Sequence, residues 1–294
     1  MHKKKLIWAQ RYKKLVEIQT FLIPLRWLKT FLITMISKNK IKLIHSLKQK
    51  KYRDNERLFI AEGPKVVGDL IEFFPPTAIF CMEQWISNNH RLIGNETEIN
   101  IVSEEELRKI SQLQNPQKVL ALFSIEKYNN KFITKKISSD KLSIALDGIQ
   151  DPGNLGTIIR IADWFGIENI ICSNESADVF NPKVIQATMG SIARVNVFYT
   201  NLYAYLNSLP EDFPLYATLL DGENVYKKQL TSGGIIVMGN EGNGISPEIK
   251  KIITNKLYIP TFQTSTNKAD SLNVAVATAI VCSEFRRNLT LQKI

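Results

Sequence analysis

Short apolar runs alternate with amphipathic stretches from residue 142 to the end of the chain. LSIALDG (142–148) and NIICS (169–173) are typical of buried strands, and TIIRIADWFG (157–166) predicts a helix that ends at Gly166. The pattern continues with strands expected at 194–199, 215–220, 234–239 and 256–260, and helices expected at 181–190, at 202–209, from Pro247 and from Ser271. This alternation predicts a parallel α/β sheet covered by helices on both faces.

A second, smaller α/β unit is expected at residues 37–125. Its predicted elements are a basic helix at 41–53, strands at 57–63, 78–82 and 121–125, and helices at 64–74 and 103–113. Residues 126–141 are polar, contain no long apolar run and are interpreted as a linker to the larger unit, residues 142–294. The basic helix carries either phosphate contacts or an ordinary solvated face.

Composition places the chain among ordinary globular proteins, with 44% apolar and 22% charged residues in 294. Collagen-like and wholly disordered classes are excluded, and no apolar run is long enough to predict a membrane span. The net charge of +10 is concentrated in residues 1–51, which contain 14 Lys/Arg and the single acid Glu17. Such a basic end indicates either a polyanionic partner or a solvated tail.

Residues 1–36 form a basic N-terminal extension with three competing interpretations. Arg26 and Lys29 interrupt the apolar run that a signal peptide needs. A basic helix on a membrane surface would be interrupted by Pro24. The third interpretation is that translation begins at Met35 and that the extension is an upstream artefact.

The cysteines and histidines restrict the chemistry. Cys81, Cys172 and Cys282 are odd in number and far apart, so we expect no disulfide framework, no metal site and a reducing, cytoplasmic location. The histidines, His2, His45 and His90, lie in the first third of the chain. Histidine is therefore not expected to act as the general base in the larger unit.

Ligands of open α/β sheets bind beyond the carboxyl ends of the strands, which draws attention to the loops after residues 148, 220, 239 and 260. In LDGIQDPGNLGTIIR (146–160), Asn154 is either a helix cap or a functional residue, and Arg160 either pairs with Asp163 or has a function. IIVMGNEGNG (235–244) is either a tight turn or a backbone approach to a ligand.

The third loop belongs to LYIPTFQTSTNKADSLNVAVATAIVCSEFRR (257–287), in which Asn273 precedes a helix that is almost wholly apolar. Its composition predicts burial on several sides, as in a deep core or a dimer interface.

These three segments, in this order and at these spacings, resemble the three motifs of the SpoU (TrmH-type) RNA 2'-O-ribose methyltransferases of the SPOUT superfamily. The resemblance covers 142–287. It implies a parallel α/β sheet with a C-terminal deep trefoil knot, preceded by a ribosomal-protein-like RNA-binding domain at 37–125. It also implies S-adenosylmethionine as the methyl donor, a tRNA or rRNA substrate and a homodimer in which Arg160 of one subunit faces the cofactor of the other.

The resemblance also implies which residues form the site. The expected catalytic and site-shaping residues are Asn154, Arg160, Glu241 and Asn273. The expected cofactor-binding residues are Thr218, Leu219, Gly239, Asn240, Glu241, Gly242, Ile259, Pro260, Leu272 and Asn273. One departure is the loop TFQTSTNKAD (261–270), which is longer than is usual in the family and puts the rim of the cofactor pocket in question.

Two roles stay open for Arg160. The family proposal makes it the base that activates the ribose hydroxyl, but a guanidinium pKa above about 12 disfavours proton abstraction. We therefore favour a clamp that binds a phosphate and stabilises the developing alkoxide. The alternatives to an RNA methyltransferase are a non-catalytic RNA-binding protein and a nucleotide-binding oxidoreductase, whose glycine-rich fingerprint fits poorly here.

Overall fold

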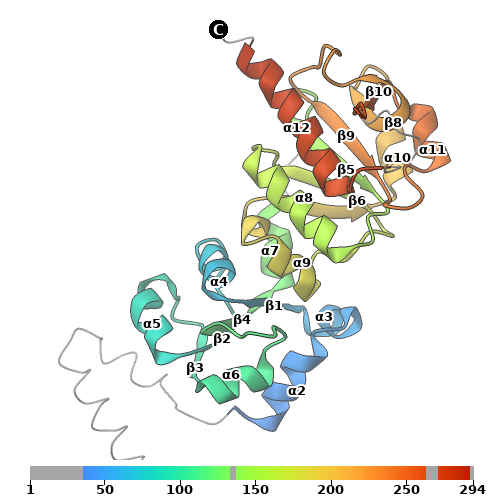
Figure 1. The fold of residues 1–294 in the computed structure, drawn as a ribbon. Coiled ribbons are helices and arrows are strands. Elements are labelled where there is room, and N and C mark those ends of the chain that lie inside the picture. Colours follow the sequence, from blue (N-terminus) through green and yellow to red (C-terminus); the bar gives the residue numbers. More distant parts are fainter. Residues whose placement is uncertain (1–35, 133–136, 263–270, 292–294) are drawn as a thin grey trace, which may run out of the picture.

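The computed structural model describes residues 36–132, 137–262 and 271–291, and these form two units, each built on its own sheet (Figure 1). The N-terminal unit, residues 36–124, contains a four-stranded sheet of order β1-β4-β2-β3. The C-terminal unit, which comprises the described residues from 137 onward, contains a six-stranded sheet of order β10-β8-β9-β5-β6-β7.

The N-terminal unit covers its sheet with short helices. The strands are β1 (Leu58–Glu62), β2 (Ala78–Cys81), β3 (Glu98–Ile101) and β4 (Val119–Ser124), and the helices are α2 (Lys38–Ser46), α3 (Lys50–Glu56), α4 (Pro64–Ile71), α5 (Glu83–Asn89) and α6 (Glu104–Ile110). Strand β4 is antiparallel to β1 and β2, whereas β2 and β3 are parallel. Helix α6 begins as the sequence predicts, because Ser103 and Glu106 form a reciprocal capping box.

The predicted helix at 41–53 is wrong in one respect, because the structure divides it into α2 and α3. Arg53 supplies the physical reason. Its Nη1 atom donates to the carbonyl oxygens of Leu47 and Lys48, 2.8 Å from each, and so satisfies the end of α2. Its Nε and Nη2 atoms donate to Oδ2 of Asp178 in the C-terminal unit, at 3.1 and 2.5 Å.

We expect Arg53→Met to lower the free energy of unfolding by about 3–5 kcal/mol. Arg53 is only 2% exposed, and its loss removes the guanidinium donors from Oδ2 of Asp178 and from two backbone carbonyl oxygens. Denaturant unfolding of the purified protein measures this. Arg108→Met on α6 removes an exposed pair with Glu104 and should change stability by less than about 1 kcal/mol. Equal effects of the two substitutions would contradict the argument.

The C-terminal unit confirms the expected parallel α/β sheet. Its strands are β5 (Leu142–Asp147), β6 (Asn169–Ser173), β7 (Asn196–Thr200), β8 (Leu215–Asn224), β9 (Gly234–Gly239) and β10 (Asn255–Tyr258), and neighbouring strands are all parallel. Its helices are α8 (Pro152–Trp164), α9 (Pro182–Ala187), α10 (Leu202–Asn207), α11 (Pro247–Ile252) and α12 (Val274–Leu291). The α8–α12 pair and the α10–α11 pair cover opposite faces, each over its own apolar cluster.

The predicted linker at 126–141 begins with a helix instead, α7 (Ile125–Phe132), while residues 133–136 lie outside the described part of the chain. Tyr128 of α7 is buried, and its hydroxyl donates to the carbonyl of Val195 at 3.0 Å, just before the edge strand β7. The helix is therefore stabilised by a tertiary contact that the local sequence does not reveal.

The two units share a continuous apolar core rather than a thin connection. The ring of Phe180, after β6, lies 5.0 Å from that of Phe59 on β1 and 5.2 Å from that of Tyr128. Helix α9 packs against β1. A cavity of about 570 Å³ lies at the junction of the two units and is lined by residues of both, among them Arg57 and Tyr199. The position of the N-terminal unit is thus fixed by packing.

Candidate active site

Asn154 is not a helix cap. Helix α8 is capped by Asp151, whose Oδ1 atom accepts from the backbone N–H of Asn154 at 2.8 Å. This leaves the side-chain amide of Asn154 available for tertiary contacts. The position of the helix start therefore places Asn154 in the first turn, with its side chain directed at the other two loops.

Glu241 joins the loop after β9 to the loop after β5. Its Oε1 atom accepts from Nδ2 of Asn154 at 2.9 Å and from the backbone N–H of Asp151 at 3.2 Å, and Oε2 accepts from the N–H of Gln150 at 3.3 Å. A carboxylate that accepts several N–H donors at a helix start is in a favourable position. Glu241 therefore acts as a structural anchor for the first loop.

Asn273 adds the third loop to the same chain of hydrogen bonds. Its Nδ2 atom donates to Oδ1 of Asn154 at 2.9 Å, while its own Oδ1 accepts from the N–H groups of Ala275 and Val276. It thus caps α12 and contacts Asn154 at the same time. Three residues that are up to 119 positions apart in sequence form one bridge, Glu241–Asn154–Asn273, across three loops.

The glycine-rich loop after β9 is a tight turn built by Asn240. Its side-chain oxygen accepts from the N–H groups of Gly242 and Asn243, both at 2.9 Å, and its Nδ2 atom donates to the carbonyl of Gly148 at 2.6 Å. A side chain at Gly239 would overlap the backbone of Gly244. The turn interpretation of Gly239 therefore has a physical basis independent of any ligand.

The pKa of Glu241 lies below its usual value. Partial burial raises it, but the hydrogen bonds from Asn154, Asp151 and Gln150 lower it by more. At neutral pH the group is an ionised acceptor, and its lowered pKa makes it a weak proton acceptor.

This shift predicts a pH dependence of stability. A depressed folded-state pKa gives stability that is present above the unfolded value, near 4.5, and lost as the pH falls through the lower folded value. We therefore expect Glu241→Gln to be less stable than the unchanged protein at neutral pH and the difference to shrink below pH 4.5. Denaturant unfolding over a pH series measures this, and a difference that grows on acidification would contradict it.

The expected cofactor-binding residues lie near the carboxyl ends of β9 and β10, at the start of α12 and, for Thr218 and Leu219, within β8. The register of β10 against β8 breaks between Lys256 and Leu257, so residues 218–222 have no partner on β10 and form a bulge within β8. A side chain at Gly222, in this bulge, would approach the backbone of Leu257 to 2.5 Å. The strand expected at 215–220 thus extends to Asn224 with an insertion at the candidate pocket.

Apolar side chains are exposed around this edge of the sheet. Leu220 is 84% and Leu272 51% exposed, and Ile259 and Pro260 are half-buried. Exposed apolar groups beside glycine-rich backbone suit a ligand with an apolar ring system. Residues 263–270, most of the long loop that the sequence singles out, lie outside the described residues, as do residues 1–35.

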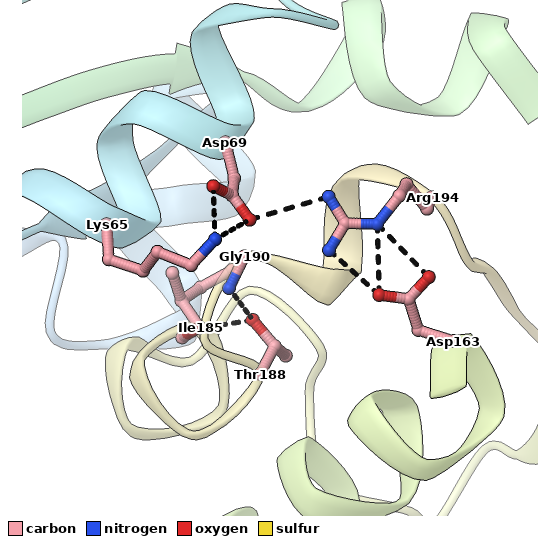
Figure 2. Close-up of polar contacts among 7 residues, drawn as sticks. All are labelled: Lys65, Asp69, Asp163, Ile185, Thr188, Gly190 and Arg194. Carbon is pink, nitrogen blue, oxygen red and sulfur yellow. Dashed lines mark hydrogen bonds and ion pairs between the residues drawn. The ribbon is translucent and has the colours of Figure 1, made fainter. Parts of the chain in front are cut away.

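Arg160 does not join the bridge. It is exposed on α8, about 9 Å along the helix axis from Asn154 at 1.5 Å per residue. The interpretation in which Arg160 pairs with Asp163 is wrong, because Asp163 pairs with Arg194 instead, at 2.8 Å (Figure 2). Arg160 has no hydrogen bond or ion pair with any of the described residues, so its guanidinium is available to a partner outside this chain.

One contact at the site has no counterpart in the sequence analysis. Asp147, the last residue of β5, accepts from the N–H of Ser246 at 2.6 Å and holds the end of the glycine-rich loop. Within residues 36–132, 137–262 and 271–291, no group of three or more His, Cys, Asp or Glu side chains is arranged to hold a metal ion. Among the helices of those same residues, none has both the length and the apolar character needed to cross a bilayer.

Comparisons with known proteins fit this geometry. Residues 141–283 match the model of the SpoU rRNA Methylase family, and residues 38–121 match the MRM3-like substrate binding domain. A solved structure from Porphyromonas gingivalis, assigned to the TrmH family of RNA methyltransferases, is 39% identical, with a TM-score of 0.73 over 86% of this chain and 99% of that chain. The chain belongs to the SpoU rRNA methylase family.

Two further relatives of this SpoU family member bear on its activity. An rRNA methyltransferase from Sinorhizobium meliloti, solved with AdoMet (S-adenosylmethionine) bound, is 30% identical, with a TM-score of 0.71 over 87% of this chain and 97% of that chain. The 23S rRNA (guanosine(2553)-2'-O)-methyltransferase RlmP of Bacillus subtilis (strain 168) is 28% identical over 84% of this chain and 96% of that protein.

The predicted family, RNA methyltransferase class and cofactor are therefore confirmed at the level of the SpoU family. A non-catalytic RNA-binding protein is not favoured, and neither is an oxidoreductase. The individual site residues stay predictions. Of these, the structure brings Asn154, Glu241 and Asn273 together and leaves Arg160 apart.

Proposed function

We propose that this SpoU family member transfers the methyl group of S-adenosylmethionine to the ribose 2'-hydroxyl of a nucleotide in ribosomal RNA. The observation that carries the proposal is the bridge Glu241–Asn154–Asn273, which ties together all three motif loops at one edge of the sheet. The names of the relatives from S. meliloti and B. subtilis support rRNA over tRNA.

The residues at this edge fit the cofactor. Its adenine would lie against the apolar side chains of Leu219, Ile259 and Leu272, and the backbone near Gly239 and Gly242 offers polar groups for its ribose and amino acid parts. When bound, S-adenosylmethionine supplies an electrophilic methyl group on a positively charged sulfur. Thr218, Asn240 and Pro260 would complete the rim.

The chain's own residues would position the nucleophile. Asn154, held from both sides by Glu241 and Asn273, orients the first loop toward the ribose, and positioning accounts for much of the rate enhancement in methyl transfer. Because Glu241 has a lowered pKa, it holds the loop rather than removing the proton. The 2'-hydroxyl proton leaves through water.

Arg160 would bind an RNA phosphate and stabilise the negative charge that develops on the 2'-oxygen. Its exposure, and the absence of a partner for it among the described residues, support a role across a dimer interface, where it would face the cofactor of the other subunit. Large apolar side chains exposed on the same two helices support such an interface: Trp164 of α8 is 85% exposed and Val276 of α12 is 50% exposed.

We further propose that residues 37–125 bind RNA through a ribosomal-protein-like fold and that residues 142–294 form the catalytic domain with a deep trefoil knot. The match of 38–121 to a substrate-binding domain supports the first assignment. The match of 141–283 to the SpoU rRNA Methylase family supports the second.

The proposal is tested with labelled S-adenosylmethionine and RNA fractions from a strain that lacks the gene. We expect label in the ribosomal RNA fraction and saturable binding of the cofactor in calorimetry. Label in tRNA alone would overturn the substrate class, and failure to bind the cofactor would overturn the function.

A further inference from the structure

Arg194 connects the two units through a shared guanidinium (Figure 2). Its Nε and Nη2 atoms donate to the carboxylate of Asp163 on α8 at 2.8–3.1 Å, and its Nη1 atom lies 3.4 Å from Oδ2 of Asp69 on α4. Asp69 also pairs with Lys65 at 2.7 Å. One side chain of the C-terminal unit therefore binds a carboxylate from each unit.

The contact involves the helix that carries the candidate catalytic residues. Asp163 follows Arg160 by one turn of α8, and Asn154 lies in the first turn of the same helix. Arg194 immediately follows a 3-10 turn (Ser191–Ala193) that packs against both α4 and α8. The orientation of the N-terminal unit is thus set directly on α8.

Shape complements charge at this contact. Gly190 has a φ of +93°, and a Cβ added there would lie 2.5 Å from the carboxylate of Asp69. The preceding Met189 also has a positive φ, of 50°, and Thr188 holds the turn by accepting from the N–H of Gly190 and donating to the carbonyl of Ile185 (Figure 2). The turn therefore forms a socket into which Asp69 fits only because residue 190 has no side chain.

We propose that Asp69 and Arg194 are specificity-determining positioning residues, which fix the RNA-binding unit on α8 and so select the nucleotide that is methylated. The proposal rests on the proposed function. The N-terminal unit would bind RNA at one place, and the active site would react with it at another. The distance and angle between them then determine which nucleotide is methylated. A change of about 1 Å at the reacting atoms is enough to slow a reaction by about 100-fold.

The chemistry of the contact suits this role. The hydrogen bonds that Arg194 donates to Asp163, more than the nearby charge of Asp69, raise the pKa of Arg194, so the guanidinium stays charged. Asp69 has one contact with Arg194, of 3.4 Å, whereas Asp163 has three, of 2.8–3.1 Å, so the Asp69–Arg194 pair is the weaker of the two links. Removing Asp69 therefore loosens the junction and leaves Asp163 paired.

The test maps methylated positions in ribosomal RNA for four proteins: the unchanged protein, Asp69→Ala, Gly190→Ala and Lys65→Met. Asp69→Ala removes the charge, whereas Gly190→Ala obstructs the socket. Both should lower kcat/KM for RNA by about tenfold, leave the affinity for S-adenosylmethionine unchanged and move part of the methylation to neighbouring nucleotides. Lys65→Met keeps the Asp69–Arg194 pair and should methylate the original nucleotide alone.

The double variant Asp69→Gly/Gly190→Ala separates obstruction from backbone strain, because Asp69→Gly removes all three atoms, Oδ2, Cβ and Cγ, that lie within 2.8 Å of the added methyl group. Its site distribution should match that of Asp69→Gly alone. An unchanged site distribution in both single variants would overturn the proposal, as would a parallel loss of cofactor affinity. Failure of the proposed function itself would be seen separately, as an absence of methylated RNA with the unchanged protein.

Discussion

Arg160→Ala is expected to lower turnover by about 10²- to 10³-fold, with the affinity for S-adenosylmethionine unchanged, because a donor to the developing alkoxide is lost. Single-turnover methyl transfer at saturating RNA measures the effect, and calorimetry measures cofactor binding. Arg160→Lys keeps the charge but not the planar pair of donors, so its turnover should lie between that of Arg160→Ala and that of the unchanged protein. The exposed cation Lys251 on α11 provides the matched control, Lys251→Ala, with activity unchanged.

Full turnover by Arg160→Ala with unchanged RNA affinity would contradict both the clamp and the base interpretations. The pH profile separates these two. If Arg160 is the base, the pH profile of turnover has a limb that disappears in Arg160→Lys. If Arg160 is a clamp, Arg160→Lys has the same profile shape and a lower turnover at every pH.

Asn154→Ala is expected to lower turnover by about 100-fold, because both links of the bridge end on this one side chain. Glu241 keeps its backbone donors Gln150 and Asp151, so the loop stays folded but loses its connection to Asn273. Asn181→Ala, which removes only the cap of α9, is the matched control and should lose stability without a comparable loss of turnover.

Asn154→Asp distinguishes the two halves of the bridge. It keeps an acceptor for Asn273 but replaces the donor to Glu241 by a second carboxylate, so we expect it to be at least as inactive as Asn154→Ala. Activity near that of the unchanged protein would show that the contact with Glu241 is dispensable and would contradict the proposed role of the bridge.

Arg160 and Asn154 together test the dimer. If Arg160 acts on the cofactor site of the other subunit, co-expressed Arg160→Ala and Asn154→Ala chains form heterodimers in which one site is intact. With random pairing, activity should return to about a quarter of the normal value. No recovery from a demonstrated heterodimer would place both residues in the same subunit's site.

The sequence predicts the C-terminal unit well because its strands are buried on both faces and read as apolar runs, as in LSIALDG (142–148). It also predicts that the loops after residues 148, 239 and 260 lie at one edge, since they follow strands of one parallel sheet. That Asn154, Glu241 and Asn273 belong to one site is implied by the resemblance to the SpoU family. The bridge geometry itself is not predictable, because it depends on Asp151 rather than Asn154 capping α8.

Tertiary contacts explain the remaining differences. Helix α7 is hidden in a polar segment because its burial depends on Tyr128 reaching Val195, 67 residues away. Asp163 is only three residues from Arg160 in sequence, but it pairs with Arg194, which is 31 residues away and donates to it from two nitrogen atoms. Local pairing rules cannot compete with such long-range partners.

The most direct test of the central claim is the chemical identity of the methylated product. Ribosomal RNA labelled by the purified protein is digested to nucleosides, which are separated and identified by mass. The account predicts a 2'-O-methylated nucleoside that is absent when Arg160→Ala or Asn154→Ala replaces the unchanged protein. A nucleoside methylated on its base would contradict the claim that the ribose hydroxyl is the nucleophile.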